Sequence, residues 1–331
     1  MSVNRPLNIL LVGGESAGVQ TLRLLIASHH NLMGVMATPS ENLHDASLWN
    51  AARKYHIDCI PAEQIRVPEF AAEIDRRNID VLLNVHALHL IPGIVLDACR
   101  IGAFNLHPGP LPEYAGLDVP SWAIYNGETT HGVTLHQMVP KVDAGSIAYQ
   151  SRFDIRPSDT GLSVMSRCVR HGMLLVKSLL DDLYQDPSVV PRIAQDLTSR
   201  RYFYRQAPNH GRLNWNRPAA QVVSHLRAAD YSPFPSPWGH PVSRFERHSV
   251  GFVKATVTEQ TTQAAPGTVG HLTDKGILVA SGDFWIDVTL VEVDGRKERA
   301  AQILHCGGIL SNADPAACAR VQTIRSAGNP C

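Results

Sequence analysis

Short apolar runs alternate with helical patterns in the first third of the chain, and this alternation constrains the fold more than any other feature. Residues 9–12 form a compact apolar run that ends in Gly13-Gly14, as in a buried parallel strand followed by a turn. Apolar residues then recur at helical spacing in 19–26. The same patterns predict, in order, strand 32–37, helix 46–55, strand 58–61, helix 67–77, strand 80–85, helix 92–98 and strand 103–106. This alternation predicts an α/β fold with a doubly wound sheet, in which ligands bind at the carboxyl ends of the strands.

The later part of the chain changes in pattern, which predicts a second domain. Strands expected at 132–139 and 146–155 are followed by Asp159-Thr160, which can cap an amphipathic helix that reaches Leu183. Gly and Asp then separate short runs that predict a small β-barrel, near 251–257, 267–271, 276–280 and 284–293. We therefore expect a larger α/β domain at 1–186, a linker at 187–210, a C-terminal domain at 211–312 and a flexible tail at 313–331.

Three polar residues follow the ends of apolar runs in a pattern that indicates catalysis. Asn105 lies near the end of the run 103–106, and His107 follows that run directly. Residues two apart in a strand point to the same face. Asp143 ends a second run, with Gly145 shortly after it. An amide that donates to an oxyanion, an imidazole that moves a proton and a carboxylate that tunes the imidazole make a minimal acyl-transfer site. Taken singly, Asn105 would equally suit an ordinary turn, and His107 a surface position before a proline.

These three residues lie within a longer stretch that resembles a known family. The stretch holds an Asn-x-His pair, a Gly-Val-Thr strand and an Asp-x-Gly in that order, in the segments 104–112, 131–138 and 142–145. It resembles the folate-dependent formyltransferases, which include methionyl-tRNA formyltransferase, the sugar-nucleotide N-formyltransferases and the formyl-tetrahydrofolate hydrolases. The resemblance continues at 8–14 and 211–215, so it covers most of the chain and thins after about residue 310.

The resemblance implies a fold, a donor and a set of site residues. It implies a Rossmann-like N-terminal formyltransferase domain, a smaller C-terminal OB-like β-barrel, and 10-formyltetrahydrofolate as the formyl donor of one-carbon metabolism. Asn105, His107 and Asp143 are implied to be catalytic. Two segments are implied to line the pocket for the pterin of the donor, which needs apolar walls and a few backbone hydrogen bonds. Their residues are His89, Leu90 and Ile91, and Val139, Pro140, Lys141, Val142 and Asp143. The alternative for both segments is a plain loop between a strand and a helix.

Departures from the family pattern bear on the acceptor. Ala115 and Leu117 stand where the family often carries arginine, and the loss of two guanidinium groups disfavours both a UDP-sugar and a tRNA. The variant in 109–123 instead resembles formyltransferase-like domains of natural-product biosynthesis, which implies a small-molecule or carrier-bound amine. A methionyl-tRNA or nucleotide-sugar formyltransferase is the alternative within the enzymes, and a non-catalytic folate- or substrate-binding subunit is the alternative outside them. A formyl-folate hydrolase is disfavoured because it carries a regulatory module ahead of the first strand.

The charge and hydropathy of the chain favour a cytoplasmic enzyme that acts on small molecules. The formal net charge is zero and the pI is about 7.3, which disfavours a nucleic-acid partner, although Arg200, Arg201 and Arg205 could form a local basic patch. No stretch reaches the roughly 18 apolar residues that span a bilayer, and the polar start of the chain is no signal peptide. We therefore expect a soluble protein of the cytoplasm. The oligomeric state is left open.

Metal, disulfide and dinucleotide sites are not indicated by the sequence. The six cysteines include no Cys-x-x-Cys pair, so free thiols in a reducing compartment are expected. No His-Glu-x-x-His motif occurs, and no metal is expected. Gly13, Gly14 and Gly18 match a dinucleotide fingerprint only loosely, and no acidic residue ends the second strand before Glu41.

Overall fold

The computed structural model describes residues 5–42 and 46–312 of the 331-residue chain, and these fold into two compact units. Within those limits, the first unit comprises 5–119, 130–154 and 165–203, and the second comprises 120–129, 155–164 and 204–312. Two short segments of the N-terminal half thus group with the second unit. The domain limits expected at 186, 210 and 312 stay a prediction, and the tail expected at 313–331 lies outside the described residues.

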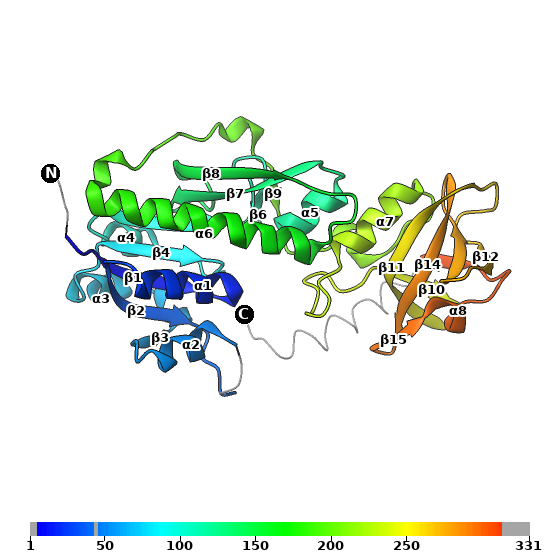
Figure 1. Ribbon diagram of the computed structural model, residues 1–331, viewed down its shortest axis with the longest axis horizontal. Coiled ribbons are helices and arrows are strands. Elements are labelled where there is room, and N and C mark those ends of the chain that lie inside the picture. Colours follow the sequence, from blue (N-terminus) through cyan, green and yellow to red (C-terminus); the bar gives the residue numbers. More distant parts are fainter. Residues whose placement is uncertain (1–4, 43–45, 313–331) are drawn as a thin grey trace. The chain divides into compact units, whose positions relative to one another are not determined.

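A seven-stranded sheet of order β3-β2-β1-β4-β5-β7-β8 forms the centre of the first unit (Figure 1). The first five strands in this order, from β3 through β2, β1 and β4 to β5, are parallel. β7 pairs antiparallel with β5, and β8 pairs antiparallel with β7. The chain builds the sheet outward from β1 to β3 and then returns to β4, so the strand order reverses between β1 and β4. The predicted α/β class is therefore confirmed. The strands are β1 (Asn8–Gly13), β2 (Asn31–Ala37), β3 (Cys59–Pro61), β4 (Val81–Val85), β5 (Gly102–His107), β7 (Thr130–Gln137) and β8 (Ile147–Asp154).

Helices cover both faces of this sheet. α1 and α6 lie over one face, where Gly172 of α6 packs on Leu106 of β5 and Thr21 of α1 reaches Met173 of α6. The other face is buried beneath α3 and α4, in a hydrophobic cluster that includes Leu82 and Ala103 of the sheet. The helices of the N-terminal half are α1 (Glu15–Ile26), α2 (Leu48–Lys54), α3 (Phe70–Arg76), α4 (Gly93–Asp97), α5 (Val119–Tyr125) and α6 (Gly161–Gln185), with a 3₁₀ turn η1 (Ala62–Arg66).

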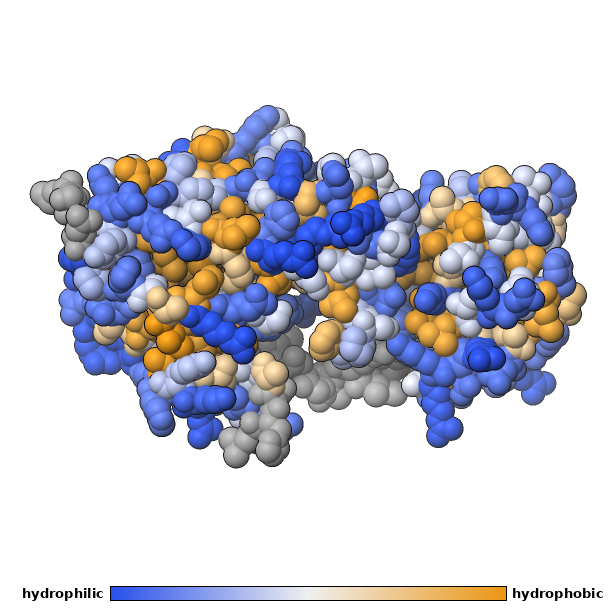
Figure 2. Space-filling view, viewed as in Figure 1, coloured by the Kyte–Doolittle hydropathy of each residue, from blue (hydrophilic) through white to orange (hydrophobic). Residues whose placement is uncertain are grey.

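The long helix α6 shows the amphipathic pattern that predicted it. Val169, Val176 and Leu183 are buried, whereas Leu174 on the opposite side is 63% exposed. In the space-filling view, hydrophobic residues of the first unit show between hydrophilic ones (Figure 2). The predicted helix is confirmed, and among the described residues no helix is long and apolar enough to cross a membrane.

The segment 187–210, which was expected to be a linker, contains a short strand that pairs with a strand of the first unit. β9 (Tyr202–Phe203) pairs in parallel with β6 (Ala115–Gly116), and the Phe203 carbonyl also accepts from the Leu117 amide at 2.8 Å. Gly116 permits this pairing because its φ is +96° and any Cβ there would overlap the Phe203 backbone. The same segment holds three 3₁₀ turns, η2 (Pro187–Val189), η3 (Leu197–Ser199) and η4 (Pro208–Gly211).

A curled antiparallel sheet of order β12-β13-β14-β11-β10-β16, with β15 beside β14, forms the second unit. Trp215, Val223 and Leu226 pack with Phe252 and the inward residues of this sheet in one hydrophobic cluster. A C-terminal β-rich unit is thus confirmed, whereas its OB-like character stays a prediction. The elements are α7 (Ala219–Ala228), β10 (Val242–Phe245), β11 (His248–Thr261), β12 (Val269–Leu272), β13 (Ile277–Ala280), β14 (Phe284–Val293), β15 (Arg296–Arg299), α8 (Ala300–Ile303) and β16 (Leu310–Asn312).

A buried carboxylate joins the starts of the central strands. Asp80 precedes β4 with a fully buried side chain, accepts from the Asn8 amide at 2.8 Å, and pairs with Arg5 at 3.1 Å and Arg100 at 3.0 Å. Although burial acts in the opposite direction, Arg5 and the Asn8 amide hold the pKa of Asp80 below its usual range. The group therefore stays ionised and paired in the folded state.

We expect Asp80→Asn to lower the free energy of unfolding by about 2 kcal/mol, because charge-assisted hydrogen bonds in a buried site are lost. Thermal unfolding followed by circular dichroism should show a Tm lower by roughly 5 °C. Asp181→Asn is the matched control, since Asp181 pairs with Lys177 on the exposed side of α6. Equal Tm values for the two variants would contradict this role of Asp80.

Candidate active site

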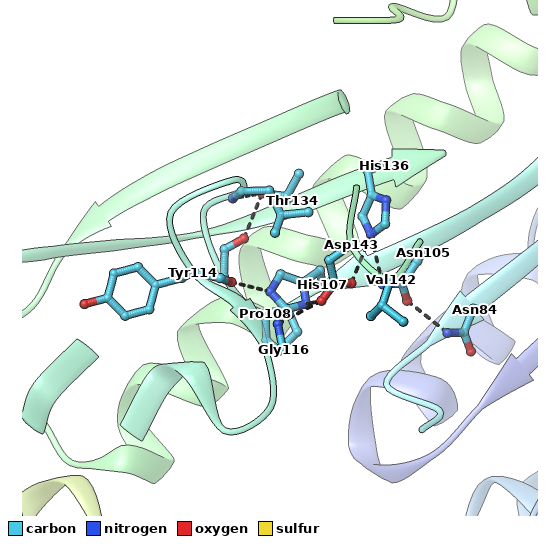
Figure 3. Close-up of polar contacts among 12 residues, drawn as sticks. Asn84, Asn105, His107, Pro108, Tyr114, Gly116, Thr134, His136, Val142 and Asp143 are labelled. Atoms are coloured by element: carbon cyan, nitrogen blue, oxygen red, sulfur yellow. Dashed lines mark hydrogen bonds and ion pairs between the residues drawn. The ribbon is translucent and has the colours of Figure 1, made fainter. Parts of the chain in front are cut away.

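Three polar side chains form a row across neighbouring strands of the first unit. Asn84 of β4 lies opposite Asn105 of β5, and Asn105 lies opposite His136 of β7. Figure 3 shows the three side chains pointing toward one another. Asn84 and Asn105 come near the carboxyl ends of their parallel strands, next to the point where the strand order reverses, which is where ligands bind in such sheets.

Hydrogen bonds along this row fix the orientation of the Asn105 amide. Asn84 Nδ2 donates to Asn105 Oδ1 at 3.0 Å, so Asn105 Nδ2 faces the other way and lies 3.1 Å from His136 Nε2. His136 Nδ1 is 2.8 Å from the Gln137 carbonyl, so the proton belongs on Nδ1 and Nε2 accepts from Asn105. One N–H of Asn105 is thereby used, and the second has no partner among the described residues. That N–H can donate to a substrate oxygen.

His107 ends β5 on the same face as Asn105, as the spacing predicted. Its side chain is 4% exposed, with Nε2 at 2.6 Å from the Tyr114 carbonyl and Nδ1 at 3.7 Å from Asp143 Oδ2 (Figure 3). The Tyr114 carbonyl therefore accepts the Nε2 proton, and Nδ1 is the basic nitrogen. Burial lowers the pKa of His107, and the Asp143 carboxylate and the Tyr114 carbonyl oppose that effect. The imidazole is thus neutral at rest, with a carboxylate beside it that stabilises the protonated form.

Asp143 lies in the turn between β7 and β8 and contacts both imidazoles. Its Oδ1 is 3.5 Å from His136 Nε2, and its Oδ2 accepts from the Gly116 amide at 2.9 Å. Although burial acts in the opposite direction, His107 and the Gly116 amide hold the pKa of Asp143 well below its usual range. Asp143 is therefore ionised. Its φ of +53° lies in the left-handed region, a strained conformation that recurs at functional sites.

Two glycines allow the backbone to approach these groups closely. A Cβ on Gly145 would overlap the Gln137 carbonyl at the end of β7, which accounts for the glycine of the Asp-x-Gly motif. A Cβ on Gly109 would lie 2.9 Å from His107 Nε2 and 2.6 Å from the Tyr114 carbonyl. Both glycines are thus required by the packing around Asp143 and His107.

Thr134 ties down the proline-rich loop that follows His107. Its Oγ1 donates to the Gly109 carbonyl at 2.7 Å and accepts from the Leu111 amide at 3.0 Å. Gln150 Nε2 adds a hydrogen bond to Thr134 Oγ1 at 3.0 Å. The loop is therefore held on both sides of its turn, which keeps the Tyr114 carbonyl in place beneath His107.

A further histidine and a carboxylate lie at the same edge of the sheet. His86 follows β4 and Glu15 begins α1, with 3.6 Å between His86 Nδ1 and Glu15 Oε2. Both residues have left-handed φ values, 56° and 52°. Both ring nitrogens of His86 are buried without a hydrogen-bond partner among the described residues. Left-handed backbone at two neighbouring residues is a feature that recurs at functional sites.

The two segments expected to line a pterin pocket lie next to each other. A Cβ on Gly93, just after the first segment, would be 3.2 Å from the Pro140 ring in the second. Leu90 is 68% and Val139 is 38% exposed, so apolar side chains are available on this surface. Ile91 belongs to the hydrophobic core beneath α4 instead. The roles of His89, Leu90, Ile91 and of Val139, Pro140, Lys141, Val142 and Asp143 in binding a pterin stay a prediction.

Two guanidinium groups approach the site region from the segment before β9. Ala115 is fully buried in its pairing with β9, so no long side chain fits there. Arg200 Nη2 donates to the Val142 carbonyl at 2.9 Å, and the Arg201 guanidinium lies over the Tyr114 ring at 4.5 Å.

A partly exposed amide, a buried imidazole and an ionised carboxylate meet at the carboxyl edge of a doubly wound sheet, an arrangement of the kind that acyl transfer requires. The residues expected from the sequence, Asn105, His107 and Asp143, are brought together, whereas Asn84 and His136 were not singled out. Among the described residues, no cluster of His, Cys, Asp and Glu is placed to hold a metal ion.

Comparisons with known proteins give the family. The model for formyl transferase matches residues 19–177, and the model for the formyl transferase C-terminal domain matches 206–307, well over half of the chain together. The chain belongs to the formyltransferase family.

Solved structures with a similar fold include sugar-modifying relatives. An N-formyltransferase from Helicobacter canadensis, in complex with folinic acid and dTDP-3-aminofucose, is 20% identical with a TM-score of 0.66, over 85% of this chain and 98% of its own. WlaRD, a sugar 3N-formyl transferase in the presence of dTDP and 5-N-formyl-THF, is 17% identical with a TM-score of 0.66, over 88% and 98%. HypX from Aquifex aeolicus, in complex with tetrahydrofolic acid, is 18% identical with a TM-score of 0.61, over 89% of this chain and 46% of HypX.

Proposed function

We propose that this protein is an N-formyltransferase that moves the formyl group of 10-formyltetrahydrofolate to the amine of a small or carrier-bound biosynthetic substrate. The observation that carries the proposal is the meeting of Asn105, His107 and Asp143 at the carboxyl edge of the sheet, in a chain of the formyltransferase family. No serine or cysteine nucleophile is needed, because the amine itself attacks.

The three side chains supply what formyl transfer requires. As the amine nitrogen bonds to the formyl carbon, the carbonyl oxygen takes up charge, and the free N–H of Asn105 donates to it. His107 Nδ1 accepts the proton of the attacking nitrogen and passes it to N10 of the folate as the bond from the formyl carbon to N10 breaks. Asp143 stabilises the imidazolium between these two steps. The products are the formylated amine and tetrahydrofolate.

Exposed apolar side chains near the site support a folate donor. Four apolar side chains near the contact between Gly93 and Pro140 are each more than a third exposed. They are Leu88, Leu90 and Ile94 on the Gly93 side and Val139 on the Pro140 side. Such side chains offer apolar walls for a flat heterocycle. Relatives of the same fold were solved with folinic acid and 5-N-formyl-THF, which supports the same donor here.

Charge and space support a small acceptor. The chain has no basic surplus for a tRNA, and Ala115 is too deeply buried to be replaced by an arginine that would hold a phosphate. We therefore propose a small-molecule or carrier-bound amine, and a cytoplasmic location where formyl-folates are made.

Calorimetry with 5-formyltetrahydrofolate tests the donor, and saturable binding is expected. A screen of amines, amino-sugar nucleotides and carrier-bound aminoacyl groups, with 10-formyltetrahydrofolate and mass detection of formylated product, tests the acceptor. Charged initiator methionyl-tRNA is included as a separate arm. No folate binding at millimolar ligand would contradict the donor, whereas efficient formyl-methionyl-tRNA formation would contradict only the acceptor.

A further inference from the structure

The second unit contains a cavity that the proposed formyl transfer does not use. Its volume is about 300 Å³, at the lower end of the range for small-ligand sites. Tyr125 lines it from the end of α5, Arg212 and Arg217 from the segment that leads into α7, and Gln221 and His225 from α7 itself. None of these residues belongs to the strands that carry the candidate active site.

The lining of this cavity carries positive charge that no lining carboxylate balances. Arg217 Nη1 donates to Gln221 Oε1 at 3.2 Å, and the Arg212 side chain makes no hydrogen bond or ion pair with the rest of the described chain. The carboxylate near the start of α7, Asp283, is engaged by the Ala219 amide at 2.7 Å. Two guanidinium groups therefore remain for an anion, which each can bind through charge-assisted hydrogen bonds.

His225 adds a buried polar group that lacks a partner. It is only 5% exposed and stands edge-on to the Tyr125 ring, with 5.1 Å between the ring centroids. Neither ring nitrogen makes a hydrogen bond within 5–42 or 46–312. Burial and the nearby Arg217 lower the pKa of His225 to about 3, so the ring is neutral and offers one N–H donor. The ring lines the cavity, so its N–H is available to donate to a ligand there.

We propose that this cavity binds a small organic anion through a phosphate or carboxylate group. Arg212 and Arg217 pair with the anionic oxygens, His225 donates a hydrogen bond, and the Tyr125 ring forms an apolar wall for the carbon part of the ligand. Phosphate and carboxylate groups share negatively charged oxygens that accept hydrogen bonds. This proposal does not depend on formyl transfer.

Nuclear magnetic resonance of the full chain labelled with ¹⁵N-histidine tests this site. Sodium phosphate and sodium acetate are titrated separately at an ionic strength of about 0.15 M, where non-specific attraction is screened. The His225 ring signals, assigned by comparison with His225→Gln, should shift saturably. Tighter binding of phosphate identifies a phosphate ester as the ligand class, and tighter binding of acetate identifies a carboxylate.

Arginine variants separate a built site from general attraction. Arg217→Gln and Arg212→Gln should each weaken binding about tenfold or more, as expected for loss of a charge-assisted hydrogen bond. Arg244→Gln is the control, because Arg244 is exposed on β10 and bonds only the Glu246 carbonyl there. Binding of 5-formyltetrahydrofolate should stay unchanged in all three variants. No saturable shift with either anion at tens of millimolar, or equal affinity in the three variants, would overturn the site.

Discussion

Replacing His107 by alanine is expected to lower kcat by about 10²–10⁴-fold, the contribution of a well-placed acid–base group. In the proposed reaction this imidazole takes the proton of the amine and returns it to the leaving nitrogen, so its loss affects both halves of the transfer. The rate is measured by mass detection of the formylated amine with donor and acceptor saturating. The fold should persist, because the polar contacts of the His107 side chain are limited to the Tyr114 carbonyl and Asp143 at the edge of the sheet.

His305→Ala is the control for this variant. His305 is exposed in the second unit and pairs with Glu246 at 2.7 Å, so its loss should leave kcat unchanged. Binding of 5-formyltetrahydrofolate and the Tm are measured alongside for both variants. If His107→Ala kept nearly full turnover with an unchanged Tm, the proton would have to travel by another route and the assignment of His107 would be wrong.

The sequence alone predicts those site residues whose positions depend on the local strand and turn pattern. Asn105 and His107 share a face because strand side chains alternate, and the alternation of strands with helices put them at the carboxyl edge of a sheet. Asp143 was found through its Asp-x-Gly motif, whose glycine the structure explains by the close approach of Gly145 to β7. Each of these inferences needs only a few neighbouring residues.

The residues that were missed depend on which strands become neighbours. Asn84 sits in an apolar run whose pattern shows only a buried strand, and His136 sits in an alternating strand with two distinct faces. Their roles arise because β5 lies between β4 and β7 in a register that places both beside Asn105. A polar residue near the end of an otherwise apolar strand was the one signal available. Register is a non-local property, so the sequence pattern could not supply the partner.

Non-local contact also explains what the linker prediction left out. β6 and β9 have two residues each, too few for any periodicity, and they pair because Gly116 admits the Phe203 backbone. This pairing carries Arg200 to the Val142 carbonyl beside Asp143. For the second unit, the short runs between Gly and Asp predicted β11 to β14 but not β10, β15 or β16. Closure into an OB-like barrel depends on how the edge strands meet, which such runs do not encode.

Asp143→Asn should lower kcat about 10²-fold or more, and it should also move the acid side of the pH profile. Asparagine tolerates the left-handed φ of +53° as aspartate does, so the turn and the fold should survive the change. The base His107 must be neutral, and burial places its pKa below the ordinary 6.5, so wild-type kcat/KM should be flat near neutrality and fall only in more acid solution.

The direction of the shift distinguishes an electrostatic role of Asp143 from a merely structural one. The Asp143 carboxylate raises the pKa of His107 against the effect of burial, so its removal lowers that pKa further. The acid limb of kcat/KM should therefore move to lower pH in Asp143→Asn, while the plateau at neutral pH drops. Asp154→Asn, an exposed position at the end of β8, should change neither the plateau nor the limb. A lower plateau with the acid limb at its wild-type position would show that Asp143 only shapes the turn, because a carboxylate 3.7 Å from Nδ1 cannot be neutralised without changing the proton affinity of that nitrogen.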